Sequence, residues 1–105
     1  ISSFDLNIVI CNLIDNALEA LNLLGENDEK KITIDIVYKQ GYIKILVGNS
    51  FDGIIHKDKR TRKNDEINHG IGLKSVQNIA EKYGGILKTN VADNWFETSV
   101  IMYEK

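Results

Sequence analysis

Residues 12–20, with the sequence Asn-Leu-Ile-Asp-Asn-Ala-Leu-Glu-Ala, place two carboxamides one helical turn apart in an apolar stretch. Positions i and i+4 share a helix face, so Asn12 and Asn16 are neighbours. Because Asn is a poor interior helix former, the pair indicates a polar ligand at this face, or two amides bonded to solvent or to the core. The surrounding residues recur with helical period over residues 5–24, at Leu6, Val9, Ile10, Leu13, Ala17, Leu21 and Leu24.

The chain has 105 residues, enough for one domain with one core. Its composition, 43% hydrophobic and 27% charged, is that of a globular protein, and the net charge of −2 predicts no general attraction to nucleic acid. The single cysteine, Cys11, is expected to be a buried thiol and allows no disulfide within the chain. There is neither a signal peptide nor an apolar run of membrane-spanning length. The abrupt start at Ile1 suggests a fragment of a longer protein.

Turn residues and hydrophobic periods predict the remaining elements. Asp5 is the expected N-cap of the first helix and Gly25 its stop. Residues 31–39 alternate between apolar and polar, and Gln40-Gly41 turns the chain into a second strand over residues 42–47. A second helix over residues 71–83 and a second hairpin over residues 86–102 follow, after a long connection rich in Lys and Arg. This order favours an α+β sandwich with helices on one face of a sheet.

Two glycine-containing segments flank the long connection. Val47-Gly48-Asn49-Ser50-Phe51-Asp52-Gly53-Ile54 closes the second strand, and alone it reads as a strand end with a turn. His69-Gly70-Ile71-Gly72-Leu73 directly precedes the second helix. Closely spaced glycines let backbone N–H groups approach a bound anion at a helix start, although a Gly-x-Gly can also be a simple tight turn.

Together, in this order and spacing, the three segments resemble the boxes of the GHKL (Bergerat) ATP-binding fold, which is a two-layer α/β sandwich with a mixed sheet. Residues 12–20 resemble its N box, residues 47–54 its first glycine box and residues 68–73 its second. The resemblance is greatest to the catalytic domain of bacterial sensor histidine kinases, within them to the peptide-sensing, accessory-gene-regulator-type group. It implies that residues 1–105 are a single catalytic domain cut from a longer sensor kinase.

The resemblance assigns ATP and Mg²⁺ as cofactors. Asn16 aligns with the Asn that coordinates Mg²⁺ on the ATP phosphates, in keeping with the oxygen ligands that this ion prefers. Asn12 aligns with the first polar residue of the N box, which is a water-activating Glu in gyrase-type ATPases. An amide cannot act as that base, so transfer to an external nucleophile is favoured over hydrolysis. Asn49 aligns with the acidic residue that accepts a hydrogen bond from the adenine amino group.

Further nucleotide contacts are implied on the glycine boxes and on the connection between them. Phe51 replaces the first glycine of its box. Thr98 aligns loosely with a threonine that assists adenine binding, or is an ordinary strand residue. Glu19 stands where many sensor kinases have a cation, so the charge that faces the phosphates is expected from the connection, and Lys63 is favoured there over four other cations or a simply solvated charge run. Other implied contacts are Gly53, Ile54, His69, Gly70, Ile71, Gly72 and Leu73.

The implied reaction transfers the ATP γ-phosphate to a histidine on a separate dimerisation domain, so neither His56 nor His69 is the acceptor. The implied partners are that domain and a response regulator, with no nucleic acid, in a membrane-anchored homodimer whose catalytic domain is cytoplasmic. Three alternatives stay open: a hydrolytic GHKL ATPase, an anti-sigma-factor serine kinase, and a degenerate module that acts by protein contacts alone.

Overall fold

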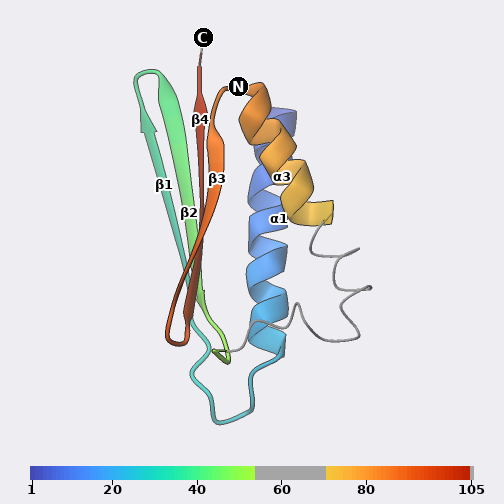
Figure 1. Cartoon of the computed structure of the whole chain (residues 1–105), viewed down its shortest axis with the longest axis vertical. Coiled ribbons are helices and arrows are strands. Elements are labelled where there is room, and N and C mark those ends of the chain that lie inside the picture. Colours follow the sequence, from blue (N-terminus) through green and yellow to red (C-terminus); the bar gives the residue numbers. More distant parts are fainter. Residues whose placement is uncertain (54–70, 105) are drawn as a thin grey trace.

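The computed structural model describes residues 1–53 and 71–104 of the chain. Two helices pack on one face of a four-stranded sheet and leave the other face uncovered (Figure 1). This is the α+β, two-layer architecture that the sequence predicted. The elements are α1 (Ser3–Asn22), β1 (Ile32–Lys39), β2 (Tyr42–Ser50), α3 (Ile71–Lys82), β3 (Ile86–Ala92) and β4 (Trp95–Tyr103).

The strands follow the order β1-β2-β4-β3, and each described pairing is antiparallel. The family resemblance had implied a mixed sheet. The described sheet is instead antiparallel throughout. Both hairpins close with two-residue turns, Gln40-Gly41 and Asp93-Asn94. Gly41 and Asp93 have positive φ angles of 95° and 55°, a backbone conformation that glycine adopts readily and aspartate more easily than most other residues.

The core lies between the sheet and the helices because alternate residues of β2 and β4 face the apolar stripes of α1 and α3. On the helix side, Val9, Val76 and Ala80 have no exposed surface. Full burial of a Val, Leu or Ile side chain stabilises a fold by about 1.5–3 kcal/mol. The sheet contributes Ile43, Ile45, Val47, Val100 and Met102 to this core, and α1 adds Leu13 and Ala17.

Helix α1 begins two residues earlier than predicted. Its N-cap is Ser2, whose Oγ accepts a hydrogen bond from the Asp5 N–H at 3.1 Å, so the assignment of the cap to Asp5 was wrong. The helix also ends at Asn22, before Gly25. Cys11 is exposed rather than buried, because it lies on the helix side away from the core. Neither described helix has both the length and the hydropathy needed to cross a bilayer.

Strand β1 alternates as predicted, yet its apolar side is largely exposed. Ile34, Ile36 and Tyr38 lie on the helix-facing side of the sheet, opposite Val47, Ile45 and Ile43. Their exposed fractions are nevertheless 47%, 48% and 64%. The reason is the position of the helices, which pack on β2, β3 and β4 and do not extend over the edge strand.

Candidate functional site

Two buried polar residues lie at the end of the sheet where β2 stops. Asn49 continues the row of helix-facing residues on β2, and its exposed fraction is 3%. Thr98 on β4 is 4% exposed. Thr98 is directly opposite Val47, and Asn49 is opposite Phe96, so Asn49 and Thr98 are diagonal neighbours on the same face. The structure therefore brings together the two residues that the resemblance implied for adenine recognition.

The Asn49 side chain has both a hydrogen-bond donor and a hydrogen-bond acceptor. The Asn49 Nδ2 donates a hydrogen bond to the Ser50 carbonyl oxygen at 3.0 Å. Buried amides normally use both their donor and their acceptor, and Oδ1 is the acceptor. The adenine amino group is a donor, so the Asn49 Oδ1 has the chemistry that the missing family carboxylate would otherwise supply.

Asn12 and Asn16 lie on the flank of α1 that faces α3. Both are half-buried, beside the core residues Leu13 and Ala17. Residues 5, 12, 16 and 19 follow one stripe along the helix, because each successive spacing is close to a whole number of turns. Asp5, the first residue of this stripe, bonds to Lys82 and Tyr83 at the end of α3. The stripe therefore lies on the side of α1 that faces α3.

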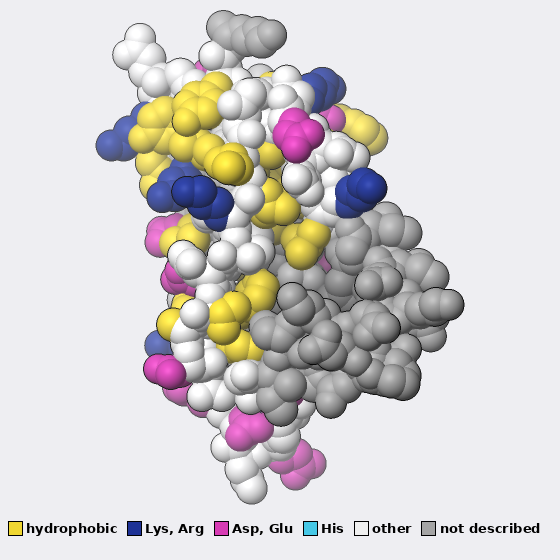
Figure 2. Space-filling view, viewed as in Figure 1, with side chains coloured by type: hydrophobic (Ala, Val, Ile, Leu, Met, Phe, Trp, Pro, Cys, Tyr) yellow, Lys and Arg dark blue, Asp and Glu magenta, His cyan; other side chains and the backbone are white. Residues whose placement is uncertain are grey.

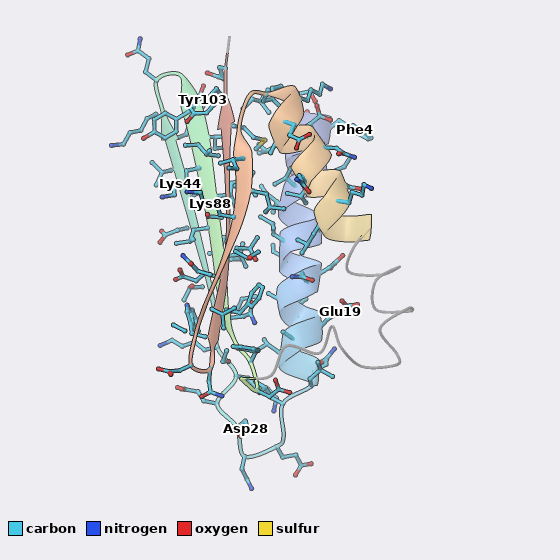
Figure 3. All side chains as sticks on the ribbon, viewed as in Figure 1. Phe4, Glu19, Asp28, Lys44, Lys88 and Tyr103 are labelled. Carbon is cyan, nitrogen blue, oxygen red and sulfur yellow. The ribbon has the colours of Figure 1, made fainter. Side chains whose placement is uncertain are left out.

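This stripe ends close to the level at which β2 ends. In Figure 1, α1 and β2 run in the same direction, so the last turns of the helix and the end of the strand lie at the same end of the molecule. Helix α3 starts on the flank of α1 and runs back toward the other end. Glu19 projects from α1 on the side where α3 lies (Figure 3). The last turns of α1, which carry Asn16 and Glu19, and the end of β2, which carries Asn49, thus lie at one end of the two layers, while Asn12 lies near the middle of α1.

Phe51 fills the position of the missing glycine. Its ring is 7% exposed and packs edge-on against Phe96, with 5.9 Å between ring centroids. The Phe51 N–H donates to the Asn94 carbonyl oxygen at 2.9 Å. Gly53 has a φ of 82°, and a Cβ there would come within 3.0 Å of the Asn94 Nδ2. The box is therefore anchored to the turn between β3 and β4, and Gly53 is required for that approach.

An ionic cluster that the sequence did not reveal joins the opposite ends of α1 and α3. The Asp5 side chain is 10% exposed and accepts hydrogen bonds from the Tyr83 hydroxyl at 2.5 Å and the Lys82 Nζ at 2.9 Å. The Tyr83 hydrogen bond, followed by that of Lys82, lowers the pKa of Asp5 below its usual value, and Asp5 in turn raises the pKa of Lys82. No sequence motif signals this cluster, because its members are 77 and 78 residues apart.

Several predicted site residues and candidate phosphate-binding cations lie outside the described residues: Ile54, Lys57, Lys59, Arg60, Arg62, Lys63, His69 and Gly70. His56, which was not predicted to bind, also lies there. Ile71 and Gly72 begin α3, and Leu73 is half-buried against the core. The described part of the second glycine box, residues 71–73, therefore lies at the start of the described helix, as predicted. The phosphate contacts assigned to the connection stay predictions.

A cavity of about 820 Å³ lies at the same end of the molecule but around different residues. Trp95 forms part of its wall, and the indole lies across Gly48 on the uncovered face of the sheet. Neither Asn16 nor Asn49 lines it, so it is distinct from the predicted nucleotide site. Its other lining residues are Leu24, Asp28, Glu29, Lys31, Thr33, Ser50, Phe51, Asp52, Ala92, Asp93 and Asn94.

Comparison with known families places these features in context. A family model described as the GHKL domain matches residues 1–103 of the chain. The chain belongs to the GHKL family. For this GHKL domain, a search of curated proteins found no significant match.

Solved structures of histidine kinases share the fold of this GHKL domain. The catalytic domain of the histidine kinase ThkA superposes with a TM-score of 0.69 at 25% identity, covering 97% of this chain and 68% of that one. The histidine kinase domain of a blue-light-activated kinase from Erythrobacter litoralis gives 0.67 at 11% identity, covering 93% and 45%. Full-length ShkA in complex with AMPPNP gives 0.68 at 14% identity, covering 93% and 21%. The last two show the fold alone.

Proposed function

We propose that this GHKL domain binds ATP with Mg²⁺ and transfers the γ-phosphate to a histidine on a separate dimerisation domain of a sensor kinase. The observation that carries the proposal is the buried Asn49–Thr98 pair, at the end of the sheet toward which the Asn12–Asn16 stripe runs. A buried polar pair at the edge of an apolar core is the usual composition of a small-molecule site. Similarity to the ThkA catalytic domain supports a kinase-type function.

The described residues have the chemistry to bind both the base and the metal-bound phosphates of ATP. Asn49 and Thr98 would bind the base, through the Asn49 acceptor. The half-buried Asn16 would supply one amide oxygen to the metal, and phosphates and water would supply the other ligands. Bound Mg²⁺ would neutralise phosphate charge, which together with positioning accounts for most of catalysis in phosphoryl transfer. Lys63 and the backbone of residues 70–73 would complete the phosphate contacts.

The identity of Asn12 favours transfer over hydrolysis. An amide has no titratable group near neutral pH and cannot take a proton from water. An acceptor imidazole needs no such base, because its neutral form already presents a lone pair. The acceptor domain, a response regulator and a membrane-anchored, accessory-gene-regulator-type parent protein complete the proposed context, with the catalytic domain in the cytoplasm.

Titration calorimetry of variants at Asn16 tests the metal assignment. Wild-type protein should bind ATP more tightly with Mg²⁺ than with a chelator. Asn16→Ala should remove most of that difference, by about tenfold in dissociation constant for one lost ligand group. Asn16→Asp should retain it, because a carboxylate oxygen also binds Mg²⁺. Equal magnesium enhancement in wild type and Asn16→Ala would contradict the assignment.

Radiolabelled ATP tests the direction of transfer. The isolated domain should neither release phosphate at a significant rate nor label itself, and it should label an added dimerisation domain. Rapid hydrolysis by the isolated domain would favour the ATPase alternative. Absence of any ATP binding would favour the degenerate interaction module.

A further inference from the structure

Strand β1 has an open hydrogen-bonding edge. It is the first strand in the sheet order, and within the described sheet only β2 pairs with it. The Ser50 N–H donates to the Lys31 carbonyl at 2.9 Å, so odd-numbered residues of β1 direct their backbone groups toward β2. Backbone groups alternate in an antiparallel ladder, so the even-numbered residues direct theirs outward. The strand contains no proline, and every outward N–H donor is intact.

Apolar side chains are exposed on both sides of this edge. Ile36 and Tyr38 are exposed on the side of the helices, and Val37 is 38% exposed on the uncovered face. Natural edge strands are usually protected by proline, by bulges or by inward-pointing charges. Here the charges within the strand, Asp35 and Lys39, lie on the uncovered face, two residues to either side of Val37.

We propose that β1 pairs antiparallel with β1 of a second copy of this chain, about a two-fold axis through Val37. That axis is perpendicular to the sheet, so the helix-facing sides of both copies stay on the same side. Asp35 then lies opposite Lys39 of the second copy, and Lys39 opposite its Asp35. Ile36 lies opposite Tyr38 of the second copy on the helix-facing side. The result is a continuous sheet of two joined four-stranded halves.

Charge selects this register over its neighbours. A two-fold axis at Asp35 would place two carboxylates directly opposite each other, which is destabilising. An axis at Ile36 would place Asp35 opposite Val37, and an axis at Tyr38 would place Lys39 opposite Val37. Only the axis at Val37 pairs both charges with opposite ones. It also places those pairs at non-hydrogen-bonded positions, where cross-strand side chains are closest.

The positions of the helices permit this pairing. Both helices contact β2, β3 or β4, and on the helix-facing side of β1 Ile32 packs against the core while Ile34, Ile36 and Tyr38 stay exposed. The two copies of β1 would therefore lie side by side with α1 of each copy set back from the junction. Pairing would satisfy the outward backbone groups of Ile36 and Tyr38 in both copies, through about four hydrogen bonds.

Sedimentation velocity over a concentration series tests the proposal through charge reversal. The wild-type mass should rise from 11.9 kDa toward twice that value. Asp35→Lys or Lys39→Asp alone should weaken association by about tenfold, because each puts like charges opposite at two positions. The double variant, with both changes, should restore it. Circular dichroism checks that each variant is folded.

Lys88→Asp is the matched control, because it makes the same charge change on the opposite edge strand. It should leave the association unchanged. A wild-type monomer at all concentrations would overturn the proposal, as would a double variant that stays as weak as the single ones. If Lys88→Asp weakened association as much as Asp35→Lys or Lys39→Asp, the contact would lie elsewhere and the proposal would also be overturned.

Discussion

At the scale of single residues, Gly48 shows how one missing side chain shapes the end of the sheet. A Cβ at this position would come within 2.6 Å of Trp95 Cζ2 and 2.9 Å of Thr33 Oγ1. The Trp95 indole is held in place by a hydrogen bond from its Nε1 to Glu97 Oε2 at 3.1 Å. Gly48 therefore leaves room for the Trp95 indole on the uncovered face of the sheet, which is the face opposite to Asn49.

Gly48→Ala should destabilise the fold by about 1–3 kcal/mol, the usual cost of overpacking. Urea unfolding measures this loss. Adding Trp95→Ala should recover part of it, because the double variant removes the larger of the two clashes. If Gly48→Ala is as stable as the wild type, the indole does not lie on this glycine.

The ionised form of Asp5 contributes to the stability of the fold, so protonation of Asp5 should contribute to the loss of stability in acid. Its pKa is lowered by the Tyr83 and Lys82 hydrogen bonds, so its ionised form is favoured in the folded state. The stabilisation is complete above the usual pKa near 3.8 and is lost as pH falls through the lower folded-state value. Asp5→Asn should therefore lower stability near neutral pH and flatten its decline below about pH 4. Urea midpoints between pH 3 and pH 7 test this, and parallel curves for both proteins would contradict it.

At the scale of elements, the first helix is capped by Ser2 rather than by Asp5, the residue that the sequence predicted. Ser2 accepts the Asp5 N–H, while Ser3 is the first helical residue and is exposed. Ser2→Ala should cost about 1 kcal/mol, and Ser3→Ala, the same change one residue later, should cost much less. Thermal melts of the two variants decide between them. Equal losses would show that Ser2 is not the cap.

Local patterns predicted the elements but not their surroundings. The helical periods of residues 5–24 and 71–83 and the two hairpin turns identified every described helix and strand. Strand β2 extends to Ser50, beyond the predicted end at Val47, because Gly48 and Asn49 pair with both neighbouring strands and Ser50 pairs with Trp95 of β4. The exposure of Ile34 and Ile36 depends on where the helices pack, which periodicity does not contain. For the site, the first glycine box predicted Asn49 and the family resemblance loosely implied Thr98, while the Asp5 cluster depends on contacts between distant parts of the chain.

At the scale of the whole molecule, charge is unevenly distributed over the residues that the structure describes. Figure 2 shows lysines around hydrophobic side chains over one half of the visible surface and acidic side chains toward the other end. The acidic end includes Asp28, Glu29, Asp52 and Asp93 around the cavity. It is also the end at which the proposed nucleotide site lies. A polyanionic ligand there must overcome repulsion, which bound Mg²⁺ and lysines of the connection would reduce.

Glu19→Lys should strengthen ATP binding by about two- to fivefold at low salt, because it reverses a charge on the stripe that carries Asn12 and Asn16. High salt should reduce the gain through screening. The control is Glu81→Lys, the same charge change on an exposed position in the last turn of α3. Equal effects of both variants would mean that only net charge matters and that the stripe does not face the phosphates.

The central claim is that a base binds at the buried end of β2. Calorimetric titration of ATP into wild type, Asn49→Ala and Asn90→Ala tests it most directly, since Asn90 is an exposed asparagine on β3. We expect Asn49→Ala to weaken binding by about tenfold, the loss of one buried hydrogen bond, and Asn90→Ala to bind like the wild type. Unchanged affinity in Asn49→Ala would contradict the account.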